Sequence, residues 1–145
     1  MKKIVVLMLA LFLGAVTYAQ THPYKEKFHF SLGQQDTVGG YTQVIRTGNT
    51  IYVSGTVAVN ITEKDVAYVY KVIEKSLQHF GASLQNVMKE TIYTTDIEAM
   101  KALNHVRKRA YGGDYPTSTW VQINRLFMPE AKLEIEVVAV LPENK

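Results

Sequence analysis

Residues 133–137, Leu-Glu-Ile-Glu-Val, and residues 115–120, Tyr-Pro-Thr-Ser-Thr-Trp, decide how this chain folds. The first stretch alternates apolar and acidic residues, which is the period of a β-strand whose two faces differ. The second stretch enters a strand through a proline. We therefore expect both to belong to the closing strands of a sheet, with Glu134 and Glu136 on one face.

Turn and capping residues mark the elements that come before these strands. Thr47-Gly48-Asn49-Thr50 separates two short apolar runs, which predicts a hairpin. Thr62 begins a helix whose apolar stripe has spacings of three and four, and Gly81 is placed to end it. Asp96 caps a second helix that the two glycines at 112–113 break. The expected elements are strands over 44–46 and 51–53, a helix after Thr62, a strand over 88–93, a helix after Asp96, and strands over 119–123 and 133–141.

This order of elements predicts an α+β fold, with two helices on one face of a mixed β-sheet. The opposite face would carry Glu134, Glu136, Val138 and Val140, so it is part acidic and part apolar. No predicted helix is left to cover it. Association with other copies of the chain would bury this face, and a closed ring of identical subunits is the natural hypothesis.

The first nineteen residues have the order of a secretory signal peptide. Two lysines precede an unbroken apolar run over 4–13, and small residues follow up to Ala19. The run is too short for a membrane anchor, which needs about 20 apolar residues, and a lipid anchor would need a cysteine, which the chain lacks. We therefore expect cleavage near Ala19, export to the periplasm or medium, and no membrane attachment afterwards. Residues 20–38 would form an N-terminal leader and a first strand region, and the leader would be polar and mobile up to residue 27. Residues 39–145 would form one domain.

Composition excludes several classes of site. The chain has 16 Lys and Arg against 13 Asp and Glu, and losing Lys2 and Lys3 leaves 14 against 13, a net charge of +1. That balance does not favour a nucleic-acid surface. Without cysteine there is no disulfide or thiol nucleophile, and the four histidines show no metal-ligand spacing. The basic run at 107–109 is expected on a solvated helix face.

Several motifs in order resemble the Rid family, also called the YjgF family. They are Gly40-Tyr41-Thr42-Gln43, the stretch 49–55, the stretches 81–84 and 87–89, Asn104 after Leu103, Tyr115-Pro116, and Leu133-Glu134-Ile135-Glu136. The resemblance covers residues 39–141. It implies a chorismate-mutase-like (bacillus-type) fold, a homotrimer with small-molecule pockets between adjacent subunits, and no metal or other cofactor. Characterised members hydrolyse reactive imines and enamines to 2-keto acids and ammonia.

The same resemblance implies the residues of the pocket. Glu134 matches the catalytic glutamate that orients water or acts as acid and base. The substrate-binding positions implied by the match are Tyr41, Ser54, Asn104, Ser118, Thr119 and Trp120.

Two of these positions depart from the family pattern. Ser118 stands where the family's deaminases carry an arginine that binds the substrate carboxylate, and Trp120 replaces a small residue. Arg125 falls on the opposite face of the strand by alternation, so it is not expected to compensate. The interpretation is an imine or enamine deaminase with a changed ligand or reduced activity. A non-catalytic module that binds a small metabolite in the same pocket is the alternative, and a ribonuclease is a third.

Overall fold

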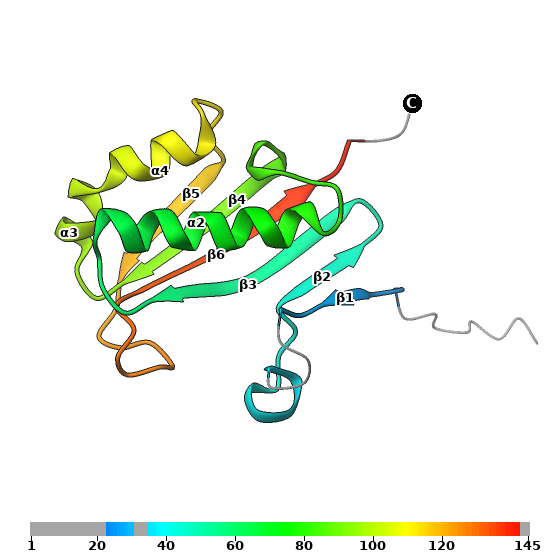
Figure 1. Ribbon diagram of the computed structural model, residues 1–145, viewed down its shortest axis with the longest axis horizontal. Coiled ribbons are helices and arrows are strands. Elements are labelled where there is room, and N and C mark those ends of the chain that lie inside the picture. The colour runs from blue at the N-terminus through cyan, green and yellow to red at the C-terminus, as the bar shows by residue number, and fades with distance from the viewer. Residues whose placement is uncertain (1–22, 31–34, 143–145) are drawn as a thin grey trace, which may run out of the picture.

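The computed structural model describes residues 23–30 and 35–142, and the predicted signal peptide over 1–19 lies outside them. The described residues form a six-stranded sheet packed against helices (Figure 1). The elements are β1 (Glu26–Phe28), a π-helical turn (Gln35–Gly39), β2 (Val44–Thr47), β3 (Thr50–Ala58), α2 (Glu63–Gln78), a 3-10 turn (Leu84–Asn86), β4 (Val87–Thr94), α3 (Ile97–Ala102), α4 (Asn104–Tyr111), β5 (Thr117–Gln122) and β6 (Leu133–Val140).

Helix α2 begins at the predicted cap. The Thr62 side chain accepts a hydrogen bond from the backbone N–H of Asp65 at 3.2 Å, which satisfies one of the free donors of the first turn. The helix ends at Gln78, slightly before Gly81, whose φ of 76° turns the chain away in the left-handed region that glycine adopts freely. Its apolar stripe is buried on the sheet at Val66, Val69, Ile73 and Leu77.

The second predicted helix is two helices, so the expectation of one continuous helix is wrong. Asp96 caps α3 by accepting from the N–H of Ala99 at 2.9 Å, as predicted. Leu103 then leaves the helical conformation, and its N–H bonds the carbonyl of Met100, three residues back, at 3.1 Å. This tight turn ends α3 and starts α4, which closes at Gly112 with a φ of 62°.

The sheet is mixed, with strand order β1-β2-β3-β6-β4-β5. All neighbouring strands are antiparallel except β4 and β5, which are parallel and are joined through α3 and α4. Figure 1 shows α2 and α4 lying across the same face of the sheet. The predicted α+β fold with helices on one face is confirmed.

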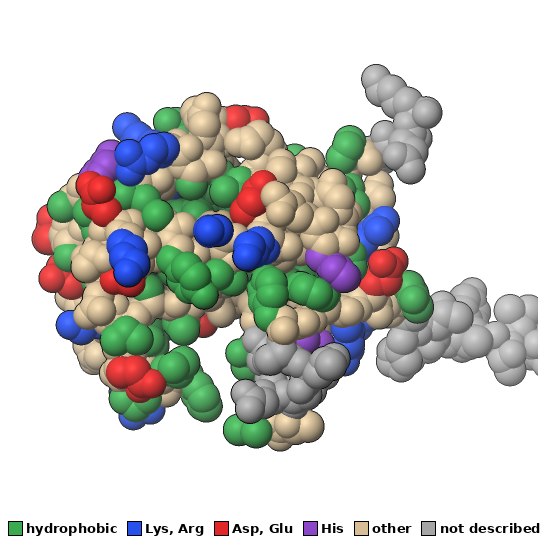
Figure 2. Space-filling view, in the orientation of Figure 1, with side chains coloured by type: hydrophobic (Ala, Val, Ile, Leu, Met, Phe, Trp, Pro, Cys, Tyr) green, Lys and Arg blue, Asp and Glu red, His purple; other side chains and the backbone are tan. Residues whose placement is uncertain are grey.

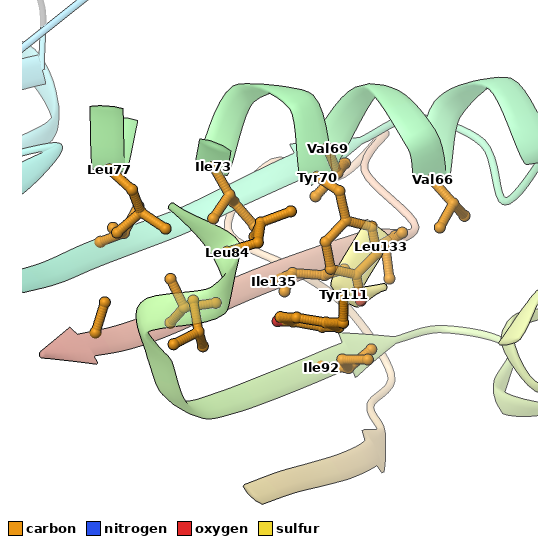
Figure 3. Packing of buried hydrophobic residues seen from close by; sticks show 14 of the residues in the cluster. Val66, Val69, Tyr70, Ile73, Leu77, Leu84, Ile92, Tyr111, Leu133 and Ile135 are labelled. Atoms are coloured by element: carbon orange, nitrogen blue, oxygen red, sulfur yellow. The ribbon is translucent and has the colours of Figure 1, made fainter. Parts of the chain in front are cut away.

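The core lies between α2 and the sheet (Figure 3). Along β6 every second residue is buried, as the alternation predicted, and the residues between them are only half-buried on the opposite face. No helix of the described residues covers that open face. The buried side chains of β6 are Leu133, Ile135, Val137 and Ala139.

Several boundaries differ from the sequence prediction, most of all that of β3, which was expected over 51–53 and spans Thr50–Ala58. Residues 26 and 27 were expected in the mobile leader but belong to β1, which pairs with β2. Phe28 in β1 stacks on His79 with ring centroids 3.9 Å apart, a contact between distant segments that local sequence does not indicate. Strand β5 begins at Thr117 and not at residue 119, because Thr117 already pairs with Lys89 of β4.

Candidate functional site

A hollow of about 390 Å³ opens on the uncovered face of the sheet, where β3 and β6 meet two loops. Figure 2 shows a notch between the loop that precedes β6 and the segment that precedes β2, and both of these segments also contribute lining residues to the hollow. Its lining residues are Gly39, Tyr41, Ser54, Gly55, Val57, Phe127, Met128, Glu134 and Glu136.

Glu134 of β6 enters this hollow directly over Gly55 of β3. A Cβ atom at Gly55 would lie 2.6 Å from Cγ of Glu134 and would overlap the carboxylate. The register of β3 against β6 shifts between Val53 and Thr56, so Gly55 lies in an irregular stretch of the strand. The missing side chain is therefore what allows the Glu134 carboxylate to lie against the sheet.

The environment of Glu134 favours its protonated form. Burial in the hollow raises the pKa of its carboxyl group above the usual value, and the negative charge of Glu136 on the same face raises it further. Glu136 accepts a hydrogen bond from the Tyr93 hydroxyl at 3.1 Å. Burial, together with this carboxylate, raises the pKa of Tyr93, so the phenol stays a donor.

Two other predicted residues lie at the rim of the hollow. The Ser54 hydroxyl donates to the backbone carbonyl of Thr42 at 2.7 Å, which ties β3 to the chain entering β2. The oxygen of Ser54 can still accept a hydrogen bond. Tyr41 is 44% exposed and its ring lies close to Gly39, where a Cβ atom would come within 2.7 Å of Cε1.

A second polar cluster lies on the other side of the sheet, beneath the helices. Glu90 of β4 is fully buried and accepts four hydrogen bonds, two on each oxygen. Tyr70 and Tyr111 donate to Oε1 at 2.6 and 3.0 Å. Arg107 Nε and the Ser118 hydroxyl donate to Oε2 at 2.6 and 2.8 Å. We call these five residues the Glu90 cluster.

Aromatic rings surround the guanidinium of this cluster. The guanidinium carbon of Arg107 lies 5.2 Å from the ring centroid of Tyr111 and 5.8 Å from those of Tyr115 and Trp120. These distances are within the range of cation–π attraction. The Trp120 indole N–H also donates to the Ser118 hydroxyl at 2.7 Å, so Ser118 links the indole to Glu90.

The charge state of the cluster is fixed by burial and by Glu90. Burial and the Glu90 carboxylate raise the pKa of both Tyr70 and Tyr111, so both remain hydrogen-bond donors. Burial alone would lower the pKa of Arg107, but the hydrogen bond and charge of Glu90 outweigh it and raise that pKa. The Arg107–Glu90 contact is therefore an ion pair, with 8% and 0% of the two side chains exposed.

The remaining predicted residues neither line the hollow nor form hydrogen bonds with the Glu90 cluster. The hydroxyl oxygen of Thr119 accepts a hydrogen bond from Lys89 Nζ at 2.6 Å, and the β5 alternation puts it on the face opposite Ser118. Asn104 begins α4, and its side-chain oxygen is buried without a hydrogen-bond partner. A buried acceptor without a hydrogen-bond partner lowers the free energy of unfolding by about 1–3 kcal/mol.

The predicted residues thus form separate groups within one chain. Tyr41, Ser54 and Glu134 share the hollow, whereas Ser118 belongs to the Glu90 cluster and Trp120 is hydrogen-bonded to Ser118. The expectation that the basic run at 107–109 lies on a solvated face is wrong for its first residue, because the Arg107 side chain is buried against Glu90.

Sequence reasoning also missed Glu90 and Gly55. A usable signal existed for Glu90, which precedes Ile92 by two residues and so falls on the buried face of β4, where an acid needs a cation.

Within residues 23–30 and 35–142, no group of three His, Cys, Asp or Glu side chains could hold a metal ion, and no helix is long and apolar enough to cross a membrane.

Replacing Gly55 with alanine is expected to displace the Glu134 carboxylate, because the new Cβ atom would occupy its position. We expect the rate of any reaction that depends on Glu134 to fall at least about tenfold, with a modest change in the thermal midpoint of unfolding. Gly81→Ala is the control, since Gly81 has open space around it but a positive φ that would strain alanine, and it should lower the midpoint while sparing activity. Unchanged activity in Gly55→Ala would contradict the placement of Glu134.

Comparison with known proteins gives a consistent result. Residues 33–141 match the protein family described as Endoribonuclease L-PSP. The chain is similar to a RutC family protein of Pyrococcus abyssi, with 30% identity over 111 residues, 70% of this chain and 87% of the relative. It is also similar to a 2-iminobutanoate/2-iminopropanoate deaminase of Dermatophagoides farinae, with 24% identity over 113 residues, 72% of this chain and 88% of that protein.

A solved structure extends the likeness to three dimensions. Rv2704 of Mycobacterium tuberculosis, a member of the YjgF/YER057c/UK114 family, aligns with a TM-score of 0.73 at 26% identity. The alignment covers 81% of this chain and 100% of that protein.

Proposed function

This chain belongs to the Rid (YjgF) family, and from that premise we propose that it hydrolyses the C=N bond of small 2-imino acids, with Glu134 as the catalytic residue. The observation that carries the proposal is the carboxyl group of Glu134, held over Gly55 in a hollow with its pKa raised. A carboxyl group with a raised pKa can donate a proton and, once ionised, take one back.

The proposed reaction uses Glu134 in both forms. The protonated carboxyl donates to the imine nitrogen, and a water molecule then adds to the imine carbon while giving one proton to the Glu134 carboxylate. The resulting carbinolamine breaks its C–N bond as the hydroxyl proton moves to nitrogen. Ammonia and a 2-keto acid leave, and Glu134 is protonated again for the next cycle.

We propose further that the protein works as a homotrimer with its ligand between subunits. The uncovered sheet face supports this, because it combines the half-buried Val138 and Val140 with the exposed ring of Tyr52. The two groups of predicted residues do not meet within one chain. Packing the open face of one copy against the β5 edge of another would bring Glu134 to Ser118 and Trp120. Residues 1–19 would export the chain before assembly.

Ammonia release from imines tests the proposed reaction. Imines are generated in situ from several amino acids, and the rate of ammonia release with the purified protein beginning at residue 20 is compared with that in buffer. Acceleration on at least one imine is expected. If no imine reacts faster than in buffer, the protein is not a deaminase of this class.

The pH dependence of kcat/KM should identify the acid. Because Glu134 acts first in its protonated form, activity should fall as pH rises through its raised pKa. Glu136→Gln removes one of the two causes of that rise, so the pKa of Glu134 should drop and the falling limb of the profile should move to lower pH. Glu130→Gln, an exposed change in the preceding loop, should leave the profile in place. An unshifted profile in Glu136→Gln would contradict the coupling.

A non-catalytic metabolite-binding module is the second candidate. It is favoured by one observation: Ser118 brings no positive charge, and its hydroxyl is already bonded to Glu90 and Trp120. Binding of 2-keto acids without imine hydrolysis would support this reading. A ribonuclease is less well supported, because two carboxylates line the hollow and would repel a phosphate backbone.

A further inference from the structure

Arg107 holds a positive charge near the surface with most of its hydrogen-bond donors unused. Its side chain is 8% exposed, and Nε alone donates to Glu90. A guanidinium carries five N–H donors in one plane. The terminal nitrogens of Arg107 have no acceptor among the described residues, and they are not among the fully enclosed polar atoms that lack a partner. They therefore keep some contact with solvent and are not bonded to another group of the described chain.

Glu90 cannot use those donors, because its own capacity is filled. A carboxylate has about four lone-pair sites, and Glu90 already accepts two hydrogen bonds on each oxygen. The same four bonds hold it in one position beneath α4. Glu90 therefore fixes Nε and the plane of the Arg107 guanidinium, and leaves the outer edge of the guanidinium unpaired.

The surroundings of that edge are aromatic and partly exposed. The rings of Tyr115 and Trp120 lie within 5.8 Å of the guanidinium carbon, and Tyr115 is 49% exposed. Trp120 is held by its bond to Ser118. Arg107 Nε and the Ser118 hydroxyl donate to the same oxygen of Glu90, so the cation lies directly beside position 118 although it comes from a helix.

We propose that Arg107 is the residue that binds the ligand's carboxylate, through its two terminal nitrogens, while Trp120 and Tyr115 contact a flat or apolar substituent next to it. A planar fork of donors matches a carboxylate in a bidentate contact. This inference rests on the proposed function, because it takes the ligand to be a 2-imino acid or its 2-keto acid product. It assigns to this chain a preference for 2-keto acids with an aromatic side chain over pyruvate.

Calorimetric titration of the protein beginning at residue 20 tests the assignment. The probes are phenylpyruvate, pyruvate and the uncharged pyruvamide. Arg107→Lys keeps a positive charge beside Glu90 but loses the planar fork, so it should fold and bind phenylpyruvate about ten- to a hundredfold more weakly. The double variant Glu90→Gln/Arg107→Gln removes both charges together, avoids an unpaired buried charge, and should bind no carboxylate. Arg109→Lys, an exposed arginine on the same helix, is the matched control.

The expected result is a weaker affinity in both Arg107 variants, an unchanged affinity in Arg109→Lys, and no binding of pyruvamide. The inference is overturned if folded Arg107→Lys binds phenylpyruvate as the wild type does, if pyruvamide binds as well as pyruvate, or if the wild type binds no 2-keto acid. Imine hydrolysis is measured in parallel on the same samples. If the wild type binds keto acids through Arg107 but releases no ammonia, the proposed reaction alone is refuted. If the Arg107 variants release ammonia and bind phenylpyruvate as the wild type does, this inference alone is refuted.

Discussion

Glu134→Gln is expected to lower kcat for imine hydrolysis by about 10²- to 10⁴-fold, the usual contribution of a positioned acid or base. Glutamine has nearly the same shape and can stay over Gly55, but it can neither give nor take a proton. Substrate binding should change little, because the proposed carboxylate contact lies at Arg107, away from Glu134. Steady-state rates of ammonia release, compared with those of Glu130→Gln, give the measurement.

Stability provides an independent check on the same variant. A carboxyl group whose folded-state pKa is raised binds protons more tightly in the folded protein, so its contribution to stability is present at low pH and is lost as pH rises through that raised pKa. Glutamine carries no charge at any pH, so it avoids the loss of stability that the ionised Glu134 causes at neutral pH. The thermal midpoint of Glu134→Gln at neutral pH should therefore equal or exceed that of the wild type. A loss of activity together with a lower midpoint would point to misfolding and not to chemistry.

Mixed trimers make the test of Glu134 more specific. Under the proposed arrangement each pocket takes Glu134 from one subunit and Arg107 from its neighbour. Refolding Glu134→Gln together with Arg107→Lys should then create some pockets with both residues intact, and activity should exceed that of either variant alone. If the mixture is only as active as the average of the two, the pocket is built within one chain.

The parts of the fold that depend on local interactions could be predicted from sequence. Thr62 and Asp96 cap helices through bonds to residues three positions away, and the alternation along β6 sets which residues face the core. A first strand region was expected within residues 20–38, but local sequence does not give the bounds of β1, because β1 pairs with β2 and Phe28 stacks on His79, both distant in sequence. The break between α3 and α4 at Leu103 could not be predicted either, because no glycine or proline lies at that position.

In the candidate site too, the sequence indicates what local motifs determine, and it does not indicate contacts between distant segments. Glu134, Tyr41 and Ser54 were predicted from motifs and do share a hollow. The space that Gly55 leaves for Glu134 depends on the pairing of two strands far apart in sequence. Arg107 was misread because basic runs on helices are usually solvated. Its partner Glu90 lies on a strand seventeen residues earlier, and the pattern that marks Glu90 as a buried acid does not say which cation pairs with it.

Glu90→Gln is expected to lower the free energy of unfolding by about 3–5 kcal/mol, the cost of leaving one member of a buried ion pair without its partner. The side chain keeps its size, so no cavity forms, and the loss reflects charge and hydrogen bonding alone. Glutamine offers one acceptor oxygen where Glu90 has two, while Tyr70, Tyr111, Arg107 and Ser118 all donate there. Urea unfolding followed by circular dichroism gives the value, and a loss below about 1 kcal/mol would contradict the prediction.

Two further variants separate the pair from its surroundings. Glu98→Gln breaks the exposed pair with Lys101 and should cost no more than about 1 kcal/mol, because solvent screens it. Glu90→Gln/Arg107→Gln leaves no unpaired charge, so it should regain part of the stability that Glu90→Gln loses. With Arg107→Gln measured as well, the double-mutant cycle gives the coupling energy of the two residues. The double variant should be more stable than Glu90→Gln, and yet it should bind no carboxylate because it has no guanidinium. From Glu90→Gln to the double variant, stability would then rise while carboxylate binding is lost, which a purely structural role for Arg107 does not predict.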